Sequence, residues 1–526
     1  MPDINSDMVL EERMKMTGPR RFAWVSPLTD WTSHSAQFTA AVIPLFPADW
    51  HCDFFVDTSD LVRLEKESFR EDKSSSHGPA GVWKYSGHNV YHFHRLAELV
   101  KEMSYERVIF QLEDSSNCQF VRLASEVFPG IVFAHDLNLN RLHHGVYRHT
   151  TAASELDNFS SSMFGPRSPR LGEYHVRGWS AEIFDQRFCA GLPKSAKRVV
   201  VVQSKTAQSA LSSSDRANRE PAPVVYQFMP PVVGSYLSRV GEQSSRSEIR
   251  ASLAATLLLE GDGTSGKKAP VFAFSPSQYL GDRVGSVLDA FARYVDNCAL
   301  VDTNPGALLW ITKSREDEDV LRKARVSRTW NSSLVSSRIV VKRARDQAEY
   351  LSLLHAADLT IALRHDYLRA LPRIVWDAMG CSIPVVLGVS CARGPDGIAL
   401  SEQLTAAAEI PESVAIRVAL GRGEVEELAA VLIEFERDSA SFRPFGEQGY
   451  CYISKACSPE RFFPFMEEVL RDTAELLDLE QIRLDEFVRS AAAGLLSTDT
   501  KSDNELNDFL PDADMSDQHS NLEIWT

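Results

Sequence analysis

Short apolar runs alternate along the chain with longer segments whose apolar residues recur at helical spacing. Such runs predict buried strands, and the amphipathic stretches between them predict helices. In the first half, strands are expected at 20–26, 52–57, 107–112, 131–136 and 197–204, and helices at 34–46, 95–103 and 120–128. Because strand and helix alternate, the strands are expected to pair in parallel in a doubly wound α/β sheet. The charged, Ser- and Gly-rich residues 65–82 read as a surface loop.

A second series of the same kind follows the Pro-rich break MPPVV at 229–233. Strands are expected at 271–275, 307–313, 337–343 and 358–364, and helices at 286–295 and 348–357, before a last strand-and-helix stretch at 371–388. The pattern therefore predicts two consecutive Rossmann-like, doubly wound domains.

The end of the chain has a different pattern. Residues 458–490 form a long amphipathic helical stretch, whereas residues 497–526 hold eight acidic residues and one lysine and almost no aromatic ones. Such a composition is typical of a disordered acidic tail. The expected organisation is an N-terminal domain at 1–228, a C-terminal domain at 229–457, a helical segment at 458–496 that packs back on the domains, and the tail.

Charge and composition narrow the classes of function. The 526 residues carry a formal charge of −16, which argues against a nucleic-acid surface because phosphate binding needs clustered Lys and Arg. No run of about 18 apolar residues predicts a membrane span, and the polar N-terminus does not read as a signal peptide. The eight cysteines include no CxxC pair, which favours reduced thiols in the cytoplasm and disfavours a zinc site.

One predicted strand ends in a pair of residues with possible chemistry. PGIVFAHD, residues 129–136, leads from a Pro-Gly turn through a buried strand to His135 and Asp136. Side chains at the carboxyl end of a parallel strand face the ligand crevice, so the pair is a candidate for the functional site. The alternative is structural, with Asp136 capping the helix that follows.

Several segments resemble the family 4-like glycosyltransferases of the GT-B architecture. SPLTDWTSHSAQFTAAVIPLF, near the N-terminus, resembles that family's first loop and helix, and PGIVFAHD resembles its PG-x-VVLHD strand. In the second half, EYLSLLHAADLTIALR and VWDAMGCSIPVVLG resemble the donor-domain signature, usually AD-x-x-LR followed by EAMA-x-G-x-PVV. The similarity extends over about residues 20–480.

The resemblance implies transfer of a sugar from a nucleotide-sugar to a glycan, lipid-linked or protein acceptor. Retention of anomeric configuration, independence of metal ions and the absence of any cofactor besides the nucleotide-sugar co-substrate are implied with it. It assigns His135 and Asp136 to the catalytic side. The donor side would be formed by residues that match the family's diphosphate and ribose positions: Arg283, Arg364, Asp377 and Gly388.

The chain departs from the family pattern at one acidic position. The family's first glutamate, eight residues before Asp377, is Arg369 here. A second hypothesis therefore stays open, in which the chain is a catalytically inactive GT-B-like scaffold or regulatory subunit of a partner glycosyltransferase. Contact with the membrane periphery also stays open under either hypothesis.

Overall fold

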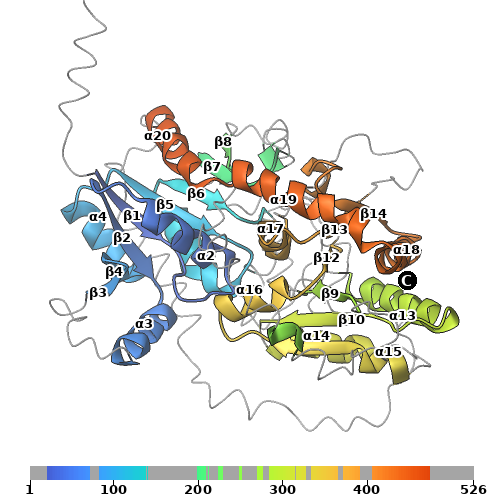
Figure 1. Cartoon of the computed structure of the whole chain (residues 1–526). Helices are drawn as coiled ribbons and strands as arrows, with labels where there is room; N and C mark the ends of the chain where they lie inside the picture. The colour runs from blue at the N-terminus through green and yellow to red at the C-terminus, as the bar shows by residue number, and fades with distance from the viewer. Residues whose placement is uncertain are drawn as a thin grey trace, which may run out of the picture. The chain divides into compact units, whose positions relative to one another are not determined.

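The fold is that of a computed structural model, drawn in Figure 1. It describes residues 20–70, 82–137, 139, 142, 198–205, 207, 208, 211, 223–228, 248–251, 269–276, 283–313, 315–326, 333–364, 371–390 and 406–473. The predicted domain boundary near 229, most of the helical segment at 458–496 and the predicted acidic tail lie outside these residues.

The first half of the chain forms an eight-stranded sheet in the order β3-β4-β2-β1-β5-β6-β7-β8. Its strands are β1 (Arg20–Val25), β2 (Trp50–Val56), β3 (Trp83–Tyr85), β4 (His88–His92), β5 (Arg107–Leu112), β6 (Ile131–Ala134), β7 (Val199–Val202) and β8 (Val224–Gln227). All neighbours pair in parallel except β3 and β4, which form an antiparallel edge. The strand order reverses between β1 and β5.

The second half forms a six-stranded, wholly parallel sheet in the order β11-β10-β9-β12-β13-β14. Its strands are β9 (Val271–Phe274), β10 (Ala307–Thr312), β11 (Ile339–Arg343), β12 (Leu359–Ala362), β13 (Val385–Ser390) and β14 (Ile416–Leu420). In chain order this is 3-2-1-4-5-6, the Rossmann arrangement, and the order reverses between β9 and β12. Ligands of such sheets bind beyond the carboxyl ends of the strands at this reversal.

Helices cover both sheets. In the first half they are α2 (His34–Val42), α3 (Thr58–Arg70), α4 (Leu96–Glu102) and α5 (Gln119–Val127). In the second half they are α13 (Val284–Leu300), α14 (Arg315–Val326), α15 (Ser333–Ser337), α16 (Gln347–His355), α17 (Arg373–Gly380), α18 (Glu424–Arg437), α19 (Arg443–Ala456) and α20 (Phe462–Asp472). Figure 1 shows α13 and α18 side by side.

Alternating residues of one strand supply both faces of the second sheet, as the pleat requires. Phe272 and Phe274 of β9 pack in the core beneath α13 and α18, whereas Val271 and Ala273 pack in the core beneath α16 and α17. Each core is closed by helices that follow the strands in sequence. Strand and helix propensities therefore agree with the tertiary fold in this half.

The core of the first sheet is completed by the last described helix of the chain. Phe462, Met466 and Val469 of α20 are fully buried against aromatic residues of β1, β2 and α2. Phe462 lies 6.0 Å from the ring of Phe38, and Phe463 lies 5.2 Å from that of Trp50. The chain thus returns to its first half after building its second.

Several elements differ from the sequence-based expectation. Residues 65–70, predicted as loop, are the last turns of α3. The edge strands β3, β8 and β14 and the neighbouring strand β4 were not predicted because they are short and only partly buried. The helices α14, α18 and α19 were also not predicted. No helix among the described residues is long and apolar enough to cross a membrane.

Candidate active site

Polar side chains collect at the carboxyl edge of the first sheet, where a doubly wound fold binds ligands. His135 and Asp136 follow β6, Gln111 lies near the end of β5 with Glu113 beyond it, and Gln203 follows β7. All except Gln203 are almost fully buried. The catalytic pair predicted from the sequence therefore stands among other polar groups that the sequence analysis did not join to it.

His135 is held on both sides of its ring. Its Nε2 lies 2.7 Å from Oε1 of Gln111, and Nε2 of Gln203 lies 2.8 Å from its Nδ1. These contacts fit a neutral ring in which Nε2–H donates to Gln111 and Nδ1 accepts from Gln203. Burial lowers the pKa of His135 to about 4, although the Asp136 carboxylate opposes the shift. Because both ring nitrogens are bonded, this geometry suits an orienting role better than proton transfer.

Asp136 orders the loops beyond two neighbouring strands. Its Oδ2 accepts from the backbone N–H of Asp114 at 3.2 Å. The carboxylate of Asp114 in turn accepts from the backbone N–H of Leu142 at 2.9 Å. The two aspartates connect the ends of β5 and β6 with the segment that follows.

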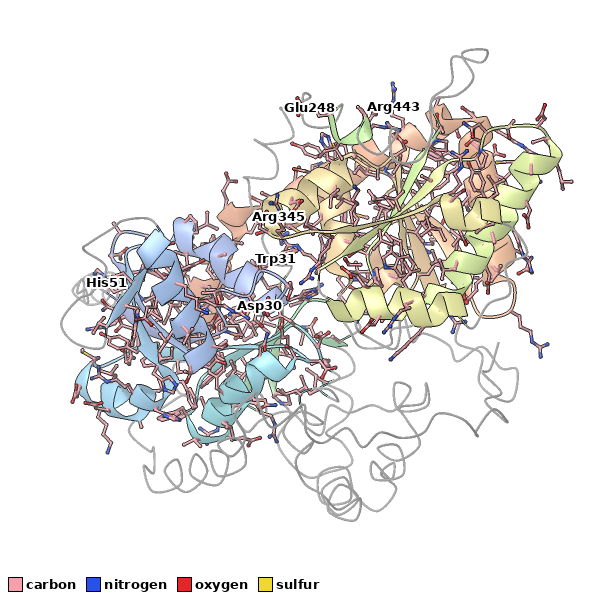
Figure 2. The ribbon with its side chains drawn as sticks, turned by 90° about the horizontal axis from the view of Figure 1, so that it is seen from below. Asp30, Trp31, His51, Glu248, Arg345 and Arg443 are labelled. Atoms are coloured by element: carbon pink, nitrogen blue, oxygen red, sulfur yellow. The ribbon has the colours of Figure 1, made fainter. Side chains whose placement is uncertain are left out.

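Glu113, which follows β5, is a buried acid that contacts the start of α2. Its Oε2 accepts from the backbone N–H of Ser35 at 2.9 Å, in the first turn of that helix. Burial, helped by the charges of Asp136 and Asp30 and opposed by its hydrogen bonds, raises the pKa of Glu113 to about 7. Asp30 lies in the loop between β1 and α2, where Figure 2 labels it beside Trp31. The first sheet thus holds a carboxyl group that changes protonation near neutral pH.

His34 is a residue of this edge to which the sequence analysis gave no functional role. It opens α2 after the N-cap Ser33, and it remains partly exposed. Phe38, one turn later on the same helix, meets the His135 ring edge-on at 5.3 Å. Partial removal from water lowers the pKa of His34 below its ordinary value, and the charge of Asp136 opposes that shift. Its position just after β1, next to the reversal of strand order, could have marked His34 as a candidate site residue in the sequence.

In the second sheet, two predicted donor residues lie at the reversal of strand order. Arg283 immediately precedes α13, in the connection from β9, and Arg364 follows β12. The backbone N–H of Arg283 donates to the carbonyl of Leu363 at 3.1 Å, so the two connections are joined. Arg364 is only 7% exposed. The connections that carry these two arginines are therefore adjacent where a phosphate-bearing ligand would be expected.

The last stretch predicted from the sequence ends at Gly388, but the strand β13 continues to Ser390. A Cβ atom at this position would lie 2.7 Å from Cδ2 of Leu420 on β14 and 3.2 Å from the backbone nitrogen of Arg364. Close packing between the strands therefore disfavours any side chain at this position, because Leu420 and the backbone of Arg364 would have to shift. A substitution of Gly388 would affect the candidate site through its contact with the backbone nitrogen of Arg364.

Asp377 lies in α17 and forms an ion pair with Arg373 one turn earlier, 2.8 Å from Nε to Oδ1. Both side chains are buried. The sequence analysis placed Asp377 at the nucleotide ribose and assigned no function to Arg373. An i, i+4 spacing of opposite charges was the signal that could have revealed the pair.

Glu424 is a further residue that the sequence analysis did not select. It begins α18 and accepts from Nε of Arg283 at 2.8 Å and from Nη2 at 2.6 Å. The two residues are 141 positions apart in sequence, and no local pattern joins them. Among the described residues, no three His, Cys, Asp or Glu side chains are grouped as a metal site.

Comparison with known proteins identifies the fold. No family model matches the sequence, and no curated protein matches it. Solved structures do match. A UDP-forming α,α-trehalose-phosphate synthase from Burkholderia xenovorans is 11% identical, with 86% of this chain and 99% of that chain covered and a TM-score of 0.53. The corresponding synthase from Burkholderia vietnamiensis is 11% identical, with coverages of 87% and 99% and a TM-score of 0.51.

A third structure is that of Anabaena HepE in complex with UDP and glucose. It is 11% identical to this chain, covers 86% of this chain and 100% of its own, and has a TM-score of 0.50. Together with the two tandem doubly wound sheets, these likenesses show that the chain has the GT-B fold of these glycosyltransferases. The expected fold is confirmed.

Proposed function

We propose that this protein is a glycosyltransferase that moves a sugar from a nucleotide-sugar donor to a glycan, lipid-linked or protein acceptor. The observation that carries the proposal is that Arg283 and Arg364 lie on two connections, joined by a backbone hydrogen bond, at the strand reversal of the second sheet. Guanidinium groups near a helix N-terminus are suited to a diphosphate. UDP is the nucleotide in the HepE complex of the same fold, which supports a uridine nucleotide as the first donor to test.

On the donor side, Arg283 and Arg364 would bind the diphosphate. Gly388 would keep the backbone of Arg364 in place, because any larger residue would displace it. For Asp377 we propose that Oδ1 stays with Arg373 while Oδ2 accepts a hydroxyl of the ribose. Transfer with retention of configuration, without a metal ion and without a further cofactor, is part of the proposal.

On the acceptor side, the role of His135 is to orient groups at the edge of the first sheet. This role is supported by its two hydrogen bonds with glutamine side chains. Asp136 would fix the loops that surround the acceptor, as its bond from the N–H of Asp114 suggests. A partner glycosyltransferase is not required by this hypothesis.

A thermal-shift screen of the purified chain tests the proposal. The ligands are UDP-glucose, GDP-mannose, dTDP-glucose and ADP-glucose at millimolar concentration without added metal. A ligand that binds only the folded state raises the melting temperature by mass action. A shift with one nucleotide that is lost in Arg283→Ala would support the donor site, whereas no shift with any of them would contradict it.

A second candidate function is a catalytically inactive GT-B-like scaffold that assists an active glycosyltransferase. It is favoured by the ion pair that engages Asp377 and by the two bonds that engage His135, since both residues belong to the expected site. Under this hypothesis the donor screen gives no shift. Co-purification of the full chain with a glycosyltransferase that loses activity without it would then be the expected result.

A further inference from the structure

The start of α18 contains a buried carboxylate whose two oxygens serve different elements. Oε2 of Glu424 accepts from the backbone N–H of Gly421 at 2.8 Å, in the turn that follows β14. Oε1 accepts from the Arg283 guanidinium and from the hydroxyl of Ser286 in the first turn of α13. The Glu424 side chain is only 3% exposed. Its position is therefore fixed from both sides.

This carboxylate holds one edge of the Arg283 guanidinium and leaves another open. The contacts use Nε and Nη2, at 2.8 and 2.6 Å. The side chain of Arg283 nevertheless keeps 36% of its surface exposed. Its backbone is anchored as well, by the N–H bond to Leu363 beside Arg364. Among the described residues, none is hydrogen-bonded to Nη1 of Arg283, whose backbone and side chain are both held in place.

We propose that Glu424 is a positioning residue of the donor site, which aligns Arg283 so that its open edge binds the diphosphate of the nucleotide. The inference rests on the function proposed above. An arginine loses rotamer freedom when it binds an anion, and a side chain that is already fixed loses less of it. A buried, fully hydrogen-bonded carboxylate is well suited to this task because it cannot itself turn towards the ligand.

A purely structural role predicts a different outcome. The Arg283–Glu424 ion pair also links the start of α13 to α18. If that link were its only role, it would stabilise the fold without changing the affinity for the ligand. A matched pair joins the same two helices further along, between Nη1 of Arg293 and Oε1 of Glu426 at 2.5 Å. Both of its side chains are more than half exposed. Glu426→Gln therefore removes a tie between the helices without touching Arg283.

The test measures binding to the full chain by calorimetry. The probes are UDP, GDP, dTDP and ADP, each beside its parent nucleoside, so that the contribution of the phosphates is separated from that of the base. Arg283→Ala should weaken the nucleoside diphosphate that binds by about tenfold or more, as expected for loss of a charge-assisted contact. Glu424→Gln should weaken it by about three- to tenfold, since the arginine remains but is less well held.

Three further results are expected if Glu424 acts through Arg283. Affinity for the nucleoside should stay unchanged in both variants, because the base does not meet the guanidinium. The double variant Arg283→Ala/Glu424→Gln should bind no more weakly than Arg283→Ala alone, because the effects of two residues that act as a unit do not add. Glu426→Gln should bind like the wild type. Glu424→Asp, which keeps the charge but withdraws it by one methylene, serves as the second variant if Glu424→Gln fails to fold.

The binding data distinguish failure of the proposed function from failure of the inference about Glu424. If the wild type binds none of the four diphosphates, the proposed function and the inference are both wrong. If the wild type binds one and Glu424→Gln binds it equally well or more tightly, only the inference is wrong. A tighter complex would mean that Glu424 competes with the phosphates for Arg283. Equal losses for diphosphate and nucleoside would show that Glu424 serves the fold alone.

Discussion

Arg373 and Asp377 stand one turn apart on α17 and form a buried ion pair, with 7% and 2% of their side chains exposed. The pair begins the helix that follows the reversal strand β12, so it lies close to the expected donor site in the chain. Asp377, predicted from the sequence to bind the ligand, thus also takes part in a buried ion pair. Substitutions at Asp377 will therefore affect stability as well as binding.

We expect Asp377→Ala to lower the free energy of unfolding by about 3–5 kcal/mol, because it leaves the Arg373 guanidinium buried without this carboxylate. Chemical denaturation monitored by circular dichroism measures the change. The double variant Arg373→Met/Asp377→Leu should recover most of the loss, since it removes both charges. An Asp377→Ala protein as stable as the wild type would contradict the observed pairing.

Glu113 should make the protein less stable as the pH rises towards neutrality. Its folded pKa of about 7 lies above the ordinary value of 4.5 for a glutamate in an unfolded chain, so the folded state holds a proton that the unfolded state releases. The stability that this proton provides is complete below about pH 4.5 and is lost as the pH rises through 7. Glu113→Gln keeps the bond from Ser35 but removes the titration.

The expected result is that Glu113→Gln gains stability over the wild type with rising pH, by up to about 1.4 kcal/mol per pH unit between pH 4.5 and 7. Urea unfolding at several pH values measures it. Parallel pH profiles for the two proteins would mean that Glu113 ionises normally.

His135 should show the opposite pH dependence. Its folded pKa of about 4 lies below the value of 6.5 in an unfolded chain, so only the unfolded state binds a proton between these values. Its contribution to stability is complete above about pH 6.5 and is lost as the pH falls to 4. Nitrogen-detected NMR should find a neutral ring at pH 5.5 with the proton on Nε2. A doubly protonated ring at that pH would contradict the two glutamine bonds.

Gly388→Ala should destabilise the protein by about 1–3 kcal/mol and weaken nucleotide binding, because the added methyl overlaps Leu420 and presses on the backbone of Arg364. Thermal melting and calorimetry with UDP measure the two effects. Shortening the opposing side chain in Gly388→Ala/Leu420→Ala should make the combined cost smaller than the sum of the two single costs. Strict additivity would show that the overlap is relieved elsewhere.

Phe462→Ala should lower the free energy of unfolding by about 3–5 kcal/mol, the cost of removing a buried aromatic side chain. The ring is fully buried between Phe38 and Phe228, at 6.0 and 5.6 Å. Fluorescence of Trp24 and Trp50, in the same core, should report the loosened packing. Glu468→Ala provides an exposed control on the same helix and should leave the free energy of unfolding nearly unchanged. An equal loss there would show that the cost does not come from the buried ring.

The strands that build the two sheets were predictable because they are buried on both faces. Runs such as Ile131–Ala134 and Val199–Val202 are apolar throughout, and both are strands. Elements whose burial depends on distant partners were missed. The edge strand β8 is largely half-buried, and the highly charged α14 has few apolar residues to reveal its period.

The positions of site residues were more predictable than their contacts. A strand end fixes where His135 lies, because the carboxyl ends of parallel strands share one edge. Its partners Gln111 and Gln203 are 24 and 68 residues away, and only the assembled sheet brings them together. The same holds for Glu424, whose bond to Arg283 depends on the packing of α13 on α18.

The return of α20 to the first sheet has a consequence for biosynthesis. The first half of the nascent chain leaves the ribosome without the helix that supplies one wall of its core, since Phe462 and Met466 are made more than 230 residues after β8. At bacterial or eukaryotic rates this interval is roughly ten to fifty seconds. During it the aromatic surface around Phe38 and Trp50 stays uncovered and open to aggregation or to a chaperone. The half that is synthesised first can therefore finish folding only after α20 has been made.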